Sequence, residues 1–494
     1  MLGTYITFPE LLLWLPLLTG VLAFTIKDPK KVKVWALLST IVTLIISLIS
    51  LRYTEHLKYL SYNNVSYKWM PYLGSSLTLG LDGMGHMLTF LTAFSFPLII
   101  LSTYNKDYKN ANSFYGLMLL SQCGLMGVFV AMDALVFYFF WELALIPVYF
   151  LCSMWGGEKR IAATFKFFIY TFVSSLLMLI GIIYVYLQSP PTISSDHSFA
   201  LQAFYKTALL PREQGWLFCL FFVAFAVKMP VFPFHTWQPD TYEQSPAPVT
   251  MVLSGIMVKM GVFAVLRWVL PVLPEGTLKF QNIVIIISII GMLYASCIAI
   301  VQDDLKRIVA YSSIAHIGLM SAAIFSLNTT GIQGVMIQML NHGVNIIGLW
   351  IVIDIIEKQL GIRKISELGG IATKAPSLAI FFVVMVLANM ALPLTNAFIG
   401  EFAMFSGLYQ YKSVYVVFAS ISVILVAVYS LNMVQKVLFG EANVKTETIR
   451  DISVTQKFML ACIVLFIFIL GVYPKPVFEL TKDTVSVILS RFGK

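Results

Sequence analysis

The chain has 494 residues, of which 59% are hydrophobic and only 12% are charged. Soluble domains carry about 25% charged residues, so this composition excludes a water-soluble protein and places the chain in a lipid bilayer. The net charge of +9 does not indicate a nucleic-acid partner, because no basic stripe interleaved with aromatic residues accompanies it.

Apolar segments follow one another along the chain, each near the roughly 20 residues that cross a bilayer as a helix. The first, from Phe8 to Ile26, is predicted to be a retained span, because it has neither a basic leader nor a small-residue cleavage site. Open sheets cannot satisfy their backbone in hydrocarbon, so we predict an all-α membrane protein, a single polytopic domain over residues 1–494. About fourteen transmembrane helices are expected, at residues 8–26, 34–51, 84–103, 113–131, 133–152, 162–188, 215–234, 247–270, 281–301, 307–327, 333–354, 377–401, 413–436 and 456–474.

The Lys and Arg residues are unevenly distributed between alternate loops. Nineteen fall in one set of loops and twelve in the other, while Lys228 and Lys259 lie inside spans. Membrane proteins keep more of these residues in their inner loops, which predicts that both termini lie on the outer face. The five cysteines stand singly in apolar runs without a CxxC pair, so we expect no metal site and no bound cofactor in this chain.

Two charged residues in the first half of the chain lie where lipid would surround them. A charge at the bilayer centre costs about 2.5–3.5 kcal/mol, so it is kept only when it is paired, hydrated or functional. Glu142, in FYFFWELALIPVYF, has no basic residue three or four positions away, so its partner must come from another span. Lys228 precedes Pro230 and Pro233, which should break the helix and leave carbonyl groups that favour a cation. We interpret both as proton-carrying groups; a structural ion pair and a lysine reaching for the interface are the alternatives.

Four further residues extend this series toward the C-terminus. Lys259, in VLSGIMVKMGVFAVLRW, is again inside a span, among small residues that let another helix approach. His316 and His342 lie on successive spans and titrate near neutral pH, as relay groups would; core histidines and axial haem ligands are the alternatives. Glu401 follows Pro393 by eight residues in another proline-interrupted span.

The spacing of these residues indicates an internal repeat. Glu142 precedes Lys228 by 86 residues, and His316 precedes Glu401 by 85. Inverted repeats with broken helices recur in membrane transporters, so we predict two inverted five-helix repeats with proline-broken helices; coincidence is the alternative. The predicted repeats cover residues 113–271 and 281–438. Four charged residues at one span boundary are expected to form a solvated cluster: Asp303, Asp304, Lys306 and Arg307.

Five stretches of the sequence resemble the proton-translocating family shared by respiratory NADH:quinone oxidoreductase (complex I) and the multisubunit cation/proton antiporters. They are FYFFWELALIPVYF, AVKMPVFPFHTWQPDTYEQSPAPVT, SGIMVKMGVF, DDLKRIVAYSSIAHIG and LPLTNAFIGEF. The resemblance covers the chain from about Leu81 to Phe439, and its most specific stretch is HTWQPDTYEQSPAPVT.

The resemblance implies a role for each candidate residue. Glu142 would pair with Lys228, and Lys259 would form the centre of a hydrophilic axis. The second half would use two histidines and a charged residue in a broken span: His316, His342 and Glu401. Most members of the family have lysine at that last position, and glutamate there is similar to the subunit M branch.

The resemblance further implies an antiporter-like subunit that couples NADH oxidation and quinone reduction in partner subunits to proton pumping. FMN, iron–sulfur clusters and quinone would belong to those partners. The neighbours would be other membrane subunits of complex I, especially those of the L and N types, in a bacterial inner membrane rather than an organellar one. A subunit of a cation/proton antiporter or membrane-bound hydrogenase, and a scaffold without transport, are the alternatives.

Overall fold

The structure is a computed structural model that describes residues 6–53, 63–191, 195–442 and 444–493. Packing divides the chain into two compact units, and each is described by itself. Unit 1 comprises Met1–Lys228, Lys259–Phe280 and Leu480–Lys494, whereas unit 2 comprises Met229–Val258 and Gln281–Glu479. The units reflect packing alone, so the inverted repeats stay a prediction.

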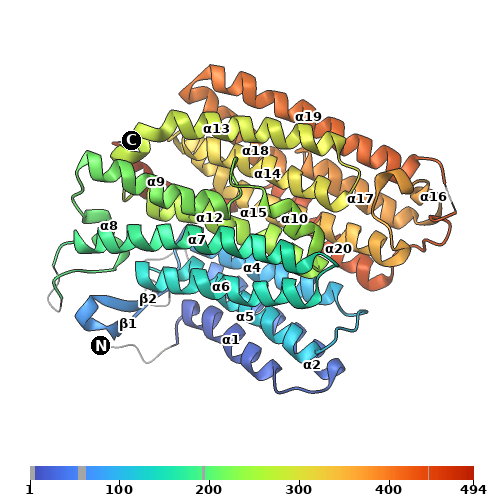
Figure 1. The fold of residues 1–494 in the computed structure, drawn as a ribbon, viewed down its shortest axis with the longest axis horizontal. Coiled ribbons are helices and arrows are strands. Elements are labelled where there is room, and N and C mark those ends of the chain that lie inside the picture. Colours follow the sequence, from blue (N-terminus) through green and yellow to red (C-terminus); the bar gives the residue numbers. More distant parts are fainter. Residues whose placement is uncertain (1–5, 54–62, 192–194, 443, 494) are drawn as a thin grey trace. The chain divides into compact units, whose positions relative to one another are not determined.

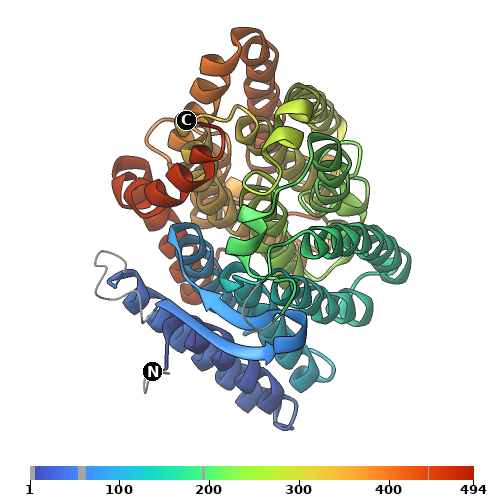
Figure 2. The same cartoon turned by 90° about the vertical axis from the view of Figure 1, so that its left-hand side faces the viewer.

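Unit 1 begins with two helices and a short hairpin. Helices α1 (Phe8–Ala23) and α2 (Pro29–Leu51) pack against α5 (Ala111–Val130). Strands β1 (Asn64–Met70) and β2 (Ser75–Gly80) form an antiparallel pair, drawn as blue arrows in Figure 2. No strand was expected here, because the hairpin lies between two spans and has no long apolar run.

The remaining spans of unit 1 start and stop at residues whose local chemistry explains the boundary. Asp82 and Asp133 precede two helices and accept hydrogen bonds from their first turns, at 2.8 Å from Gly85 N in the first case, as N-caps do. One long helix ends at Lys228, just before Pro230, which confirms the predicted break. These helices are α4 (Gly83–Ser102), α6 (Ala134–Trp155), α7 (Arg160–Leu187), α8 (Leu201–Lys206) and α9 (Pro211–Lys228), of which α6 and α7 lie side by side (Figure 1).

Unit 2 is built around one long buried helix, α15 (Thr329–Leu360), against which its neighbours α14, α17 and α18 pack. The second predicted break is also present, between α17 and α18, where Ala391 and Leu394 have positive φ angles of 57° and 74° on either side of Pro393. The other bounds are α10 (Trp237–Gln244), α11 (Ala247–Val252), α14 (Leu305–Ile324), η5 (Ile365–Glu367), α16 (Ile371–Lys374), α17 (Pro376–Asn389), α18 (Asn396–Tyr411), α19 (Ser413–Phe439) and α20 (Val454–Val472).

The predicted fold class, an all-α membrane protein, is confirmed. Among the described residues, eleven helices are long and apolar enough to cross a membrane. Each of the fourteen predicted spans overlaps a helix, and those outside the eleven correspond to α1, α9 and the broken pair α17–α18. Three helices run from one unit's residues into the other's along the chain: α12 (Val258–Ala264), α13 (Pro274–Val301) and α21 (Lys475–Ser490).

Candidate functional site

Lys228 and Glu142 lie in unit 1 on α9 and α6, both of which pack against α7. Lys228 is 1% exposed, and its Nζ lies 5.6 Å from the centre of the Trp141 ring and 5.9 Å from that of Phe167. In the part of the chain that the structure describes, neither Nζ of Lys228 nor Oε1 of Glu142 has a hydrogen-bond partner. The lysine is therefore held by aromatic faces and by the C-terminal end of its helix rather than by a direct bond to the glutamate.

Lys259 lies in a helix whose hydrogen-bond pattern changes twice. Residues Leu253–Met257 and Val265–Val269 form π-helical turns, and the α-helical stretch between them carries the fully buried Lys259. Turns of this kind are rare and are frequent at functional sites. Within unit 2, a Cβ on Gly255 would lie only 2.7 Å from the Ile347 side chain, so α15 approaches this segment as the small residues predicted. These π-helical turns could not be predicted from the composition of the span.

His316, His342 and Glu401 are brought together in unit 2. Nδ1 of His316 lies 3.0 Å from Oε1 of Glu401, and the rings of His316 and His342 are 5.4 Å apart between centroids. Gln338 donates to the same Glu401 oxygen at 3.4 Å. The two histidines are buried, at 5% and 2% exposure. Residues separated by up to 85 positions in the chain thus form one buried cluster with groups able to exchange a proton.

An amide network supports the broken helix beside this cluster. Asn341 donates to the carbonyl of Asn396 at 2.7 Å, and Asn345 donates to the side-chain oxygen of Asn396 at 3.0 Å. Asn345 also reaches the carbonyl of Ala388 at 3.3 Å. Buried backbone groups released by a break need such partners. Nothing in the sequence indicated that donors on α15 would reach this break.

The charged residues around Asp304 are solvated only in part: Asp303 is exposed, as expected from the sequence, but Lys306 is buried and the group is tied together by ion pairs. Lys306 is 5% exposed and its Nζ lies 2.7 Å from Glu357. Arg307 contacts Glu243 at 2.8 Å, and Arg363 pairs with Glu243 and Asp304. Glu243 lies 64 residues before Arg307 and Glu357 lies 51 residues after Lys306, so inspection of the span boundary alone could not find them.

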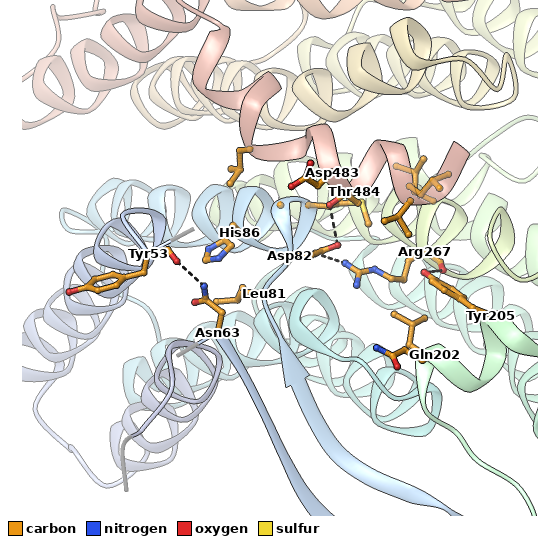
Figure 3. Close-up of a pocket in the computed structure, with 17 residues that line it drawn as sticks. Tyr53, Asn63, Leu81, Asp82, His86, Gln202, Tyr205, Arg267, Asp483 and Thr484 are labelled. Atoms are coloured by element: carbon orange, nitrogen blue, oxygen red, sulfur yellow. Dashed lines mark hydrogen bonds and ion pairs between the residues drawn. The ribbon is translucent and has the colours of Figure 1, made fainter. Parts of the chain in front are cut away.

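A second charged pair, missed from the sequence, lines a cavity of about 500 Å³ in unit 1 (Figure 3). Nη2 of Arg267 lies 2.7 Å from Asp82, which also accepts a hydrogen bond from Thr484 at 3.3 Å. Burial acts to raise the pKa of Asp82, but the Arg267 charge and the Gly85 amide outweigh it and hold that pKa below its usual value. The available signal was Arg267, which stands three residues before the end of the predicted span 247–270 and was counted with the loop that follows. Among the described residues, no three His, Cys, Asp or Glu side chains gather as metal ligands.

The chain is similar to membrane subunits of known respiratory complexes. A family described as "NADH:quinone oxidoreductase/Mrp antiporter, TM" matches residues 131–426. NADH-quinone oxidoreductase subunit M of Rickettsia typhi is 35% identical over 466 residues, 92% of each chain. F(420)H(2) dehydrogenase subunit M of Methanosarcina mazei is 34% identical, over 97% of this chain and 98% of its own. A chain of respiratory complex I from Thermus thermophilus with bound NADH has a TM-score of 0.88 at 27% identity, covering 97% of this chain and 99% of that chain.

Proposed function

Since the chain belongs to the NADH:quinone oxidoreductase/Mrp antiporter family, we propose that its buried charges form the proton path of a respiratory complex. The chain is an antiporter-like membrane subunit, of the M type, of NADH:quinone oxidoreductase, and it takes part in proton translocation. What is proposed here is the set of residues that does so, the orientation of the chain and the identity of its neighbours.

The contact between His316 and Glu401 supports the proposal most directly. A buried imidazole 3.0 Å from a carboxylate is a pair whose proton can move with little rearrangement, because an imidazole nitrogen can either donate or accept a hydrogen bond. The carboxylate lies one turn beyond the break between α17 and α18, and broken helices are where transporters place such groups.

The proposed mechanism couples charges in sequence. Quinone chemistry in distant subunits changes the electric field near Glu142, which alters how readily Lys228 holds its proton. Protons then pass by Lys259 and the histidines to Glu401 and the outer face, an order taken from the family resemblance. Each step needs only buried groups whose affinity for a proton depends on a neighbouring charge.

The electron-transfer chemistry belongs to other subunits in this proposal. FMN, iron–sulfur clusters and quinone are bound by partners, and the adjacent membrane subunits are of the L and N types. The chain lies in a bacterial inner membrane with both termini on the outer face, as the loop charges indicate. The likeness to complex I over nearly the whole chain supports this assembly.

A second candidate function differs in the electron donor. The relative from Methanosarcina mazei, whose name describes an F(420)H(2) dehydrogenase, matches nearly as well and over a larger share of the chain. Purification of the native complex from its own membranes, followed by assays with NADH and with reduced F420, separates the two. NADH oxidation with co-purified flavin and iron–sulfur proteins is expected; oxidation of reduced F420 alone would assign the chain to the second class.

A further inference from the structure

A small cavity opens at the end of unit 2 where the loop charges of the inner set gather. It has a volume of about 140 Å³ and lies between the end of α13, the start of α14, η5 and the last turns of α19. Polar residues on its wall are Gln302, Asp303, Tyr429, Asn432 and Lys436. Asp303 and Lys436 are exposed, whereas Tyr429 is 2% exposed. The cavity therefore leads from charged surface residues to a buried tyrosine.

The tyrosine contacts a serine that lies one helical turn before the buried His316. The Tyr429 hydroxyl donates to Oγ of Ser312 at 2.9 Å, and Ser312 also accepts from Asn389 at 3.0 Å. Ser312 precedes His316 by one turn of α14, a spacing of about 5–6 Å between Cβ atoms. His316 in turn contacts Glu401. Polar groups thus follow one another from the cavity wall to the carboxylate, all within unit 2.

Oγ of Ser312 and Nδ1 of His316 each have a polar partner, but one other atom of this series does not. Nε2 of His316 is buried and has no hydrogen-bond partner among the described residues. A buried ring nitrogen without a partner costs free energy. Such a nitrogen is retained more readily where it takes up and releases protons.

We propose that this cavity is a proton inlet of unit 2: it supplies protons to His316 and Glu401 from the inner-loop side, and their release to the outer face depends on the charges at Lys228 and Lys259. The inference rests on the proposed function. A hydronium ion that reaches the cavity gives a proton to the Tyr429 oxygen and is left as water, as Tyr429 passes its own proton to Oγ of Ser312. Ser312 passes its proton to Nε2 of His316, which becomes positively charged, so neither oxygen gains a net charge. Rotation of both hydroxyls restores the starting arrangement.

The volume of the cavity agrees with this use. A water molecule needs about 10–15 Å³ of such space and two or more polar partners, so a cavity of about 140 Å³ with five polar wall residues accommodates several. A purely structural role for Tyr429, as a donor that supports the end of α17 through Ser312, requires neither the cavity nor the histidine one turn away.

The test compares Tyr429→Phe with Tyr415→Phe in the intact complex in membrane vesicles. Both tyrosines lie on α19 and donate one hydrogen bond, Tyr415 to Asn282 at 2.8 Å, but Tyr415 is remote from the cavity. A positioned proton donor contributes about 10²-fold or more to a proton transfer. We therefore expect proton pumping to fall at least about tenfold in Tyr429→Phe only. The solvent isotope effect on NADH oxidation should rise with it, which a loss of assembled complex alone would not produce.

Two further measurements keep this proposal separate from the proposed function. Lys228→Ala is assayed in the same vesicles: if it stops pumping while Tyr429→Phe pumps like Tyr415→Phe, the inlet is overturned and the proton path stands. If all three variants pump like wild type, both are overturned. Asn432→Cys should react with a membrane-impermeant thiol reagent from the inner face and lose pumping on reaction; reaction from the outer face only would overturn the inlet.

Discussion

The Lys228 side chain is held in unit 1 by contacts that depend on its positive charge but that accept no hydrogen bond from its ammonium group. Cation–π contacts away from water contribute about 2 kcal/mol, and the ends of the Trp141 and Phe167 side chains supply no acceptor. The ammonium group can therefore lose its proton without breaking a hydrogen bond. Such a lysine responds to a distant charge more readily than one in a tight ion pair.

Lys228→Ala should abolish most proton pumping while the complex still assembles. Ala removes the basic residue of the last turn of α9, and loss of a positioned proton carrier costs about 10²-fold or more. Glu142→Gln should weaken pumping too, because a neutral side chain no longer favours the protonated lysine. Proton flux in vesicles measures both, with the exposed Lys279→Ala as the matched control. Normal pumping in Lys228→Ala would remove this residue from the path.

Glu401 should depend on its sign as much as on its proton. Glu401→Gln removes both and should reduce pumping sharply, whereas Glu401→Asp keeps both and should retain most activity. Glu401→Lys places a cation where His316 now finds an anion 3.0 Å away, so a protonated imidazole would be repelled. We expect that variant to pump poorly. The exposed Glu441→Gln serves as control, and wild-type flux in Glu401→Gln would make Glu401 a structural residue.

At the scale of elements, the break between α17 and α18 is maintained by side chains of a continuous helix. Asn341 and Asn345 stand one turn apart on α15 and both reach the broken segment. A continuous helix offers fixed donors, while the interrupted one supplies carbonyl groups and positions Glu401. α15 therefore supports the break, whereas the interrupted helix carries the candidate residue Glu401.

Asn345→Leu should destabilise this region by roughly 1–3 kcal/mol, the cost of leaving a buried acceptor without its donor. Leu has a similar size, so the loss reports the hydrogen bonds to Ala388 and Asn396 rather than a cavity. Thermal unfolding of the purified complex measures the effect. Asn112→Leu removes a hydrogen bond at a less buried site and should change the midpoint little; equal shifts would contradict the support role.

At the scale of the whole molecule, the orientation in the membrane can be tested by two exposed loop residues. In a background with the native cysteines replaced by serine, Val444→Cys should react with an impermeant thiol reagent from the inner face. Leu210→Cys should react from the outer face. Both side chains are exposed, at 83% and 66%, and the excess of Lys and Arg in one loop set predicts the assignment. The reverse pattern would invert the topology and place the cavity beside Tyr429 on the outer face.

The sequence was sufficient to predict the membrane fold class and the two proline breaks, because hydropathy and proline positions are local signals. It also singled out six candidate residues as isolated polar groups in apolar spans, and their role in proton transfer stays a prediction. It did not reveal that Lys228 rests on aromatic rings or that His316 contacts Glu401 directly. Those contacts arise from packing between segments far apart in the chain. The ion pairs of Lys306 and Arg363 were missed for the same reason, and the hairpin because its strands are short.

The π-helical turn before Lys259 sets the direction of this side chain through the number of residues that the turn contains. An α-helix advances about 100° per residue, so a turn with one extra residue rotates all that follows by about that angle. Lys259 follows one such turn and precedes the other. Substitutions of similar size leave this phase unchanged, whereas deletion of one residue from Leu253–Met257 would keep the hydropathy of the span and turn the lysine to another side of the helix. The direction of the Lys259 side chain thus depends on the number of residues in the preceding turn, and not on the composition of the span or the identity of its residues.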